Sequence, residues 1–198
     1  YRCKDGTLCT FHDHSLKRTT GGADPRLLTE VTWDEVRKVN VGGWGKWKGS
    51  DYDPTRPARL EEVLALARPG RKIYVEVKAG DASAKWVPDI KAAFARVPSA
   101  TPDQVVFIAF GAETVAALKR EMPEYKAYLL SACTESPRYV ENHGPVIPAA
   151  EIVRRCQACH ADGIDIHYVD DITTVEYFQT ILAAGLEVHC WTVDRPLA

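Results

Sequence analysis

The sequence contains no apolar run approaching the ~20 residues that a membrane-spanning helix requires, so no such span is predicted. It also lacks an excess of either charge. Lys and Arg number 25 against 27 Asp and Glu, for a net charge of −2, and there is no basic block. This balance argues against a nucleic-acid-binding surface. The glycine patterns of phosphate-binding loops and dinucleotide sites are absent as well. The 198 residues, of which 45% are hydrophobic and 26% charged, have the composition of an ordinary globular domain.

Six cysteines are spread along the chain, and their number does not identify a redox compartment. Cys156, Cys159 and His160 form the Cys-x-x-Cys-His string to which c-type haem is attached. However, Ile152, Cys156 and Cys159 have the spacing of one apolar helical stripe, which would bury both thiols. We therefore expect no haem.

The first 58 residues combine a hairpin with irregular chain. Asp5-Gly6 is typical of a tight two-residue turn, and a strand is predicted over residues 8–11. A capping box opens a short helix predicted over residues 32–40. Residues 41–58 hold Gly, Trp, Pro and Asp without periodicity, and we interpret them as an irregular excursion.

From residue 60 onward, strands and helices alternate regularly. Strands are predicted over residues 73–78, 105–110, 127–130, 164–168 and 186–193, with helices near residues 60–67, 87–97, 115–122, 152–163 and 175–185. This order indicates parallel strands with helical crossovers, and both a doubly wound sheet and a (β/α)8 barrel are compatible with it.

The strand over residues 73–78 favours the barrel. Ile73, Val75 and Val77 would lie on one face, and the intervening polar side chains on the other. A strand covered by helices on one side and facing a polar barrel mouth on the other has this pattern. A barrel usually needs about 250 residues. This chain is about 50 residues shorter, which indicates that a first unit or two is missing.

Three clusters of chemically active residues follow predicted strands, where barrel active sites lie. They are residues 11–14 with Arg18 close behind, the pair Glu76 and Lys78, and residues 191–194. A histidine can act as general acid or base, a carboxylate can bind Ca²⁺ or Mg²⁺, and a lysine can neutralise a phosphate oxygen. Alternatively, the histidine could cap a loop, the acidic and basic residues could form a structural ion pair, and the tryptophan could belong to the core.

The sequence resembles the glycerophosphodiester phosphodiesterases. This resemblance implies a TIM barrel, which we expect to be seen here without its first strand-helix unit and its last helix. The resemblance spans nearly the whole chain, and its motifs occur in the family's order. They are the Lys-Asp-Gly to Arg-Thr-Thr run of residues 4–20, a Leu-Thr stretch within 28–35, Leu-Glu-Glu-Val-Leu at 60–64, Val-Glu-Val-Lys at 75–78 and Trp-Thr-Val-Asp at 191–194.

The resemblance implies metal-dependent hydrolysis of a glycerophosphodiester to an alcohol and glycerol phosphate. In this family two histidines act as general acid and base, and three carboxylates hold a divalent cation, usually Ca²⁺ or Mg²⁺. His12 matches the second histidine and Glu76 the third metal carboxylate. Lys78 matches a lysine that contacts the phosphate, and Trp191 an aromatic residue of the pocket.

Phe110 and His167 are further candidates for binding substrate, because each is predicted near the end of a strand. His189 shares the inward face of its strand with Trp191, and could either line the pocket or belong to the core. We interpret residues 1–58 as a catalytic hairpin plus an insertion over the barrel mouth, and residues 59–198 as the rest of one barrel domain.

The family's first histidine, in a His-Arg-Gly motif, and its Glu-x-Asp metal pair have no counterpart in this sequence. We therefore expect phosphodiesterase activity provided that an N-terminal segment with these motifs exists. Two alternatives therefore stay open: a catalytically inactive or binding-only barrel, and a phosphodiesterase of lysophospholipids or inositol phospholipids. The partner implied is a small-molecule substrate. The substrate class favours a periplasmic or secreted location, while headgroup, cation, compartment and oligomeric state are not indicated.

Overall fold

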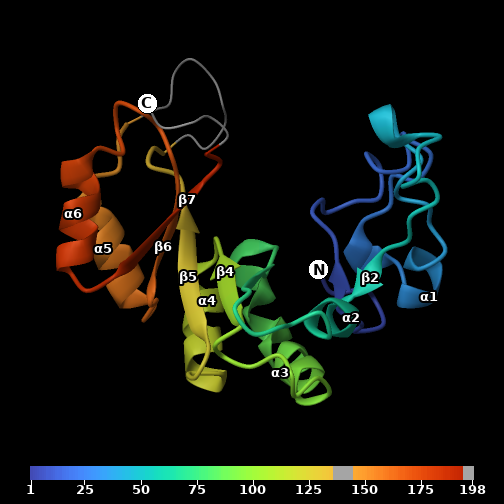
Figure 1. Cartoon of the computed structure of the whole chain (residues 1–198), viewed down its shortest axis with the longest axis horizontal. Coiled ribbons are helices and arrows are strands. Elements are labelled where there is room, and N and C mark those ends of the chain that lie inside the picture. The colour runs from blue at the N-terminus through green and yellow to red at the C-terminus, as the bar shows by residue number, and fades with distance from the viewer. Residues whose placement is uncertain (136–144, 194–198) are drawn as a thin grey trace. The chain divides into compact units, whose positions relative to one another are not determined.

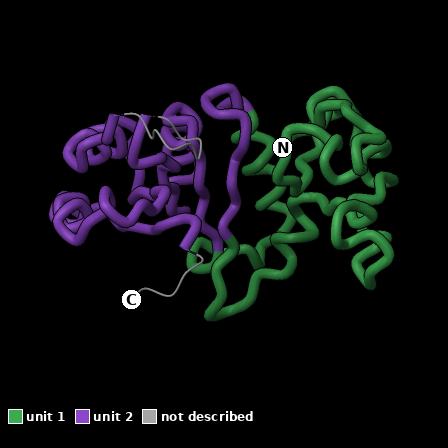
Figure 2. The backbone as a smooth tube through the Cα atoms, turned by 90° about the horizontal axis from the view of Figure 1, so that it is seen from above, with its two compact units in different colours: residues 1–73, 86–104 green, residues 74–85, 105–198 purple. Residues whose placement is uncertain are grey.

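The computed structural model describes residues 1–135 and 145–193. Asp194, the last residue of the Trp-Thr-Val-Asp motif, lies outside the described residues. The chain divides into two compact units (Figure 2), the first comprising Tyr1–Ile73 with Trp86–Gln104 and the second Tyr74–Lys85 with Val105–Ala198. No helix in the described ranges is long and apolar enough to span a membrane.

Unit 2 is built on a parallel sheet with the strand order β3-β4-β5-β6-β7 (Figure 1). The strands are β3 (Ile73–Glu76), β4 (Val105–Ala109), β5 (Lys126–Ser131), β6 (Gly163–His167) and β7 (Glu187–Trp191). Consecutive strands are neighbours in the sheet, so each crossover returns to the adjacent position. This arrangement confirms the predicted parallel strands with helical crossovers.

Three of the four connections between these strands contain one helix each within unit 2: α4 (Ala112–Glu121), α5 (Ala149–Ala158) and α6 (Val175–Ala183). They lie where the sequence periodicity predicts helices, with ends shifted by a few residues. Gly185 follows α6 with a φ of +80°, a conformation that glycine adopts without strain. Ile164 and Ile166 of β6 are fully buried, as expected for the face of a strand that helices cover.

The Cys-x-x-Cys-His string belongs to this packing. Ile152 and Cys156 of α5 are fully buried, and Cys159 at the end of the helix is 2% exposed. The predicted burial of both thiols is confirmed. Burial raises the pKa of Cys156 to about 12, so this thiol stays protonated at neutral pH.

Unit 1 contains short elements around a small core. They are β1 (Cys9–Thr10), β2 (Ala58–Arg59), α1 (Trp33–Val36), α2 (Leu60–Leu64), α3 (Val87–Ala95) and the 3-10 turns η1 (Leu28–Glu30) and η2 (Gly45–Trp47), while η3 (Gly80–Trp86) leads into α3. Strands β1 and β2 pair antiparallel. The core comprises Cys3, Cys9, Leu16, Leu28, Val31 and Val36.

The N-terminal hairpin differs from its prediction. Cys3 N donates to Thr7 O at 2.8 Å, and Arg2 lies opposite Leu8, so the loop holds three residues rather than two. Gly6 closes this loop with a φ of +89°. A three-residue hairpin loop places a glycine in that conformation at its last position. The register of the hairpin is therefore shifted by one residue.

Candidate active site

The carboxyl ends of the parallel strands in unit 2 gather five of the six predicted site residues. Glu76 ends β3, Phe110 follows β4, His167 ends β6 and Trp191 ends β7, while Lys78 comes two residues after β3. Because parallel strands end at the same edge of a sheet, this is the edge where barrel enzymes place their active sites.

Glu76 and Lys78 lie on one face because the side chains of extended chain alternate. Lys78 Nζ lies 2.7 Å from Glu76 Oε2, and the two side chains are 16% and 25% exposed. The ion pair considered from the sequence is therefore present. It holds a cationic and an anionic group side by side at the strand end, where both still reach solvent.

Aromatic rings form a second group at this edge. The ring of His167 stacks on Trp191 with centroids 4.6 Å apart. Phe110 contacts the same indole edge-on, with ring centroids 6.1 Å apart. Trp191 Nε1 donates to the backbone carbonyl of Asp165 at 3.2 Å, which fixes the orientation of the indole. Phe110 is 50% exposed, so the group offers apolar surface to a bound molecule.

Below these residues lies a polar layer that sequence reasoning only partly identified. The hydroxyl of Tyr74 lies 3.3 Å from His189 Nδ1, and the imidazole of His189 stacks on Tyr128 at 4.8 Å. Asp165 faces the same group and is 8% exposed. Burial raises the pKa of Asp165; an electrostatic contribution from His189 opposes this shift, and the carboxylate of Glu76 adds to it. The signal in the sequence was the alternation of polar residues along β6 and β7.

His12 belongs to unit 1, and its surroundings are described within that unit. Its side chain is 79% exposed, and its Nδ1 lies 2.9 Å from Asp13 Oδ1. Arg18 donates to both carboxylate oxygens of Asp13, at 2.6 and 2.7 Å. These hydrogen bonds lower the pKa of Asp13 to about 2. Asp13 is thus a fixed anion that accepts from Nδ1–H and leaves Nε2 for proton transfer.

Arg18 is itself held from its other side, because its guanidinium lies over the ring of Trp44 at 4.5 Å. The order of contacts is therefore His12 to Asp13, Asp13 to Arg18, and Arg18 to Trp44. No sequence motif indicated the last of these contacts, since the tryptophan comes from the irregular segment of residues 41–58.

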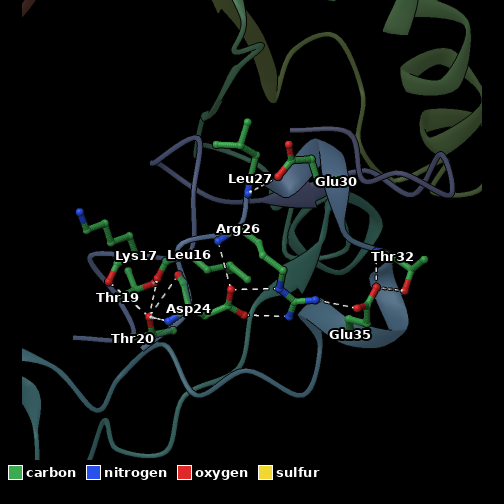
Figure 3. Close-up of polar contacts among 10 residues, drawn as sticks. All are labelled: Leu16, Lys17, Thr19, Thr20, Asp24, Arg26, Leu27, Glu30, Thr32 and Glu35. Atoms are coloured by element: carbon green, nitrogen blue, oxygen red, sulfur yellow. Dashed lines mark hydrogen bonds and ion pairs between the residues drawn. The ribbon is translucent and has the colours of Figure 1, made fainter. Parts of the chain in front are cut away.

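The chain after Arg18 is ordered by a polar network (Figure 3). Thr20 Oγ1 lies 2.9 Å from Leu16 O and accepts from Asp24 N at 3.0 Å. Arg26 bonds both oxygens of Asp24 and reaches Glu35 Oε1 at 2.7 Å. Glu35 also accepts from the backbone of Thr32, as the capping box predicted. The network connects the loop that follows His12 to α1.

The chemistry of the donor set tests the expected cation. In residues 1–135 and 145–193 there is no group of three His, Cys, Asp or Glu side chains able to hold a metal ion. Glu76 provides one carboxylate of the kind that Ca²⁺ and Mg²⁺ prefer, but its closest charged partner is Lys78. These residues could contribute a single ligand to a cation site and do not form one by themselves.

A family model described as the glycerophosphoryl diester phosphodiesterase family matches residues 2–198. A structure described as a glycerophosphoryl diester phosphodiesterase from Silicibacter pomeroyi is 20% identical, with a TM-score of 0.75, over 98% of this chain and 70% of that one. A phosphodiesterase from Oleispira antarctica, solved with the product sn-glycerol-3-phosphate, is also 20% identical, with a TM-score of 0.75, over 98% of this chain and 70% of that one.

A glycerophosphodiester phosphodiesterase structure from Galdieria sulphuraria is 18% identical, with a TM-score of 0.67, over 96% of this chain and 68% of that one. No curated protein matches the chain. The family match and these structures confirm the predicted TIM-barrel type of fold.

Proposed function

The chain belongs to the glycerophosphoryl diester phosphodiesterase family, whose reaction is the hydrolysis of glycerophosphodiesters, and we propose the roles that its residues take in that reaction. The products are an alcohol and glycerol phosphate. The similar structure from Oleispira antarctica holds sn-glycerol-3-phosphate. We therefore propose the same product here, from a small-molecule glycerophosphodiester.

The observation that carries the proposal is the pairing of Glu76 with Lys78 at the carboxyl edge of the sheet. A phosphodiester is an anion, and negative charge on its oxygens is redistributed toward the leaving oxygen as the P–O bond breaks. Lys78 Nζ provides a positive charge at that edge, already positioned by its carboxylate partner, and preorganised charge is an efficient stabiliser of a transition state. Trp191, Phe110 and His167 supply the wall against which the substrate packs.

His12 is proposed as one histidine of a two-histidine mechanism. In its imidazolium form it donates the Nε2 proton to the oxygen of the leaving group, as the P–O bond to that oxygen breaks and the attacking oxygen bonds to phosphorus. As neutral imidazole it acts as base in the return step. The contact between Asp13 and Nδ1 supports this role, because a carboxylate that accepts from Nδ1–H orients the ring and leaves Nε2 as the nitrogen that gains and loses the catalytic proton.

Metal dependence is also a proposal. Glu76 would supply one of three carboxylate ligands to Ca²⁺ or Mg²⁺. A bound divalent cation would supply positive charge to a phosphate oxygen. We further propose that residues 1–58 act as a catalytic hairpin with an insertion over the barrel mouth.

The test is direct. Glycerophosphocholine is incubated with the chain and Ca²⁺, Mg²⁺ or EDTA, and ³¹P NMR follows the conversion of the diester signal to that of sn-glycerol-3-phosphate. Cation-dependent formation of this product is the expected result for the full-length protein, provided that it supplies the His-Arg-Gly and Glu-x-Asp motifs that residues 1–198 lack. Absence of turnover with every cation, in a folded sample, would support the binding-only alternative. Turnover of a lysophospholipid in preference to water-soluble diesters would assign the enzyme to the second alternative.

A further inference from the structure

The irregular segment of residues 41–58 displays aromatic rings that the proposed reaction does not use. Trp44, Trp47 and Tyr52 line a shallow pocket of about 280 Å³, together with Val41, Gly42 and Thr55. Trp47 is 38% and Tyr52 64% exposed, and their rings meet edge-on at 5.5 Å. Large aromatic side chains left in water next to an apolar pocket are characteristic of interaction surfaces.

One cationic side chain lies over these rings, and two more occur in the same segment. Lys46 Nζ lies 4.7 Å from the ring centroid of Trp47. Lys46, Lys48 and Arg56 are all exposed, and none lies within ion-pair distance of a carboxylate in the described ranges. We refer to Trp47, Tyr52, Lys46, Lys48 and Arg56 as the aromatic–basic patch.

The segment is structured and presents the patch in one conformation. Asp53 accepts from the side chain of Asn40 and from Gly49 N, the latter at 3.0 Å. Gly42 packs so closely beneath the loop that a Cβ atom there would lie 2.0 Å from Tyr52 O. The loop backbone that carries the rings is therefore ordered by contacts within unit 1, which reduces the entropy lost on binding.

We propose that the aromatic–basic patch docks the protein on a phospholipid surface that contains anionic lipids. Trp and Tyr favour the headgroup level of a bilayer, because each has an apolar ring and a polar group. Exposed lysine and arginine side chains of the same segment are attracted to anionic headgroups. A small quaternary ammonium ligand fits less well, since Lys46 already lies over the ring of Trp47.

This docking goes beyond the proposed hydrolysis, because neither Trp47 nor Tyr52 is among the residues assigned to the reaction. It can therefore be measured without substrate. The whole chain is mixed with vesicles of phosphatidylcholine alone, or of 70% phosphatidylcholine and 30% phosphatidylglycerol, and the bound fraction is determined by flotation. Binding to the anionic vesicles should be stronger by about tenfold or more.

Two variants separate the contributions to binding. W47A/Y52A should weaken partitioning into the anionic vesicles by about tenfold or more, through lost apolar contact. K46A/K48A should remove most of the preference for the anionic vesicles, by about tenfold. L66A is the matched control: Leu66 is 63% exposed and lies outside the segment, so its replacement should leave partitioning unchanged.

Circular dichroism and the Tm should be the same for W47A/Y52A as for the parent chain, which distinguishes a failed docking from a failed fold. Because flotation needs no substrate, its result is also independent of the proposed reaction. The proposal is overturned if the parent chain does not float with anionic vesicles, or if W47A/Y52A floats equally well. It is also overturned if sedimentation velocity shows that the patch instead joins two copies of the chain, with a dimer that W47A/Y52A abolishes.

Discussion

Lys78 Nζ lies 2.7 Å from Glu76 Oε2 at the end of β3. The two residues are two positions apart in extended chain, so their side chains lie on the same face. Each group positions the other, and both remain partly accessible to solvent. Removing either partner therefore changes both the charge of the site and the orientation of the residue that is left.

Replacing Lys78 by methionine keeps the length of the side chain and removes its charge. We expect kcat/KM for a glycerophosphodiester to fall by about 10²–10³-fold, the range typical of lost electrostatic stabilisation. Steady-state assays measure this. K72M is the control, because Lys72 is an exposed lysine in the chain before β3. Equal losses in the two variants would contradict a role for Lys78 at the phosphate.

E76Q tests the proposed metal ligand with little change of shape. The cation concentration that gives half-maximal turnover should rise by at least about tenfold, because the amide is a weaker ligand than a carboxylate. Activity is titrated against Ca²⁺ and Mg²⁺ in both proteins. E113Q should titrate like the parent chain, since Glu113 is exposed on α4. A lower maximal rate with an unchanged cation requirement would exclude Glu76 as a ligand.

H12A should lower kcat/KM by about 10²–10⁴-fold, the usual contribution of a general acid or base. H14A is a close control, because His14 is also exposed and lies two residues away. The pH–rate profile adds a second readout, since removal of the catalytic group should remove the limb that it controls. Unchanged activity in folded H12A would eliminate this histidine from the mechanism.

D13N should alter the response to acid. Arg18 lowers the pKa of Asp13 in the folded protein to about 2, below its ordinary value of 3.8. The pair therefore contributes stability that is present above about pH 4 and is lost as the pH falls toward 2. Compared with the parent chain, D13N should have a lower Tm at pH 7 and a smaller loss of Tm between pH 4 and pH 2.

Scanning calorimetry across this pH range gives the comparison. D103N, at an exposed carboxylate that makes no ion pair in the described ranges, should follow the parent chain. A D13N protein whose Tm falls with acid as steeply as that of the parent chain would show that the Asp13–Arg18 pair does not stabilise the fold.

The alternation of strands and helices beyond residue 60 could be read from local signals. Apolar periodicity distinguishes the two element types, and glycines such as Gly185 end the helices. The pairing of Glu76 with Lys78 was predictable for the same reason, because side chains two residues apart in extended chain share a face. The short helix after Thr32 was likewise predicted from a local capping motif.

The hairpin shows where local reasoning failed. Asp5-Gly6 is a strong two-residue turn signal, yet the loop contains three residues. Its backbone is engaged by another part of unit 1: Lys4 N donates to Val31 O at 2.8 Å, and Trp33 N donates to Asp5 Oδ2 at 2.9 Å. Contacts with a segment almost thirty residues away thus select the turn, and no dipeptide preference contains that information.

The sequence by itself determined the fold class, the family and the residue types at the strand ends, because these follow from short-range patterns along one chain. Only the tertiary structure decided which side chains meet. His167 stacks on Trp191 because the register of β6 and β7 places them side by side. Arg18 lies on Trp44 because the irregular segment folds back toward it. Such contacts depend on distances between residues far apart in sequence, which folding alone establishes.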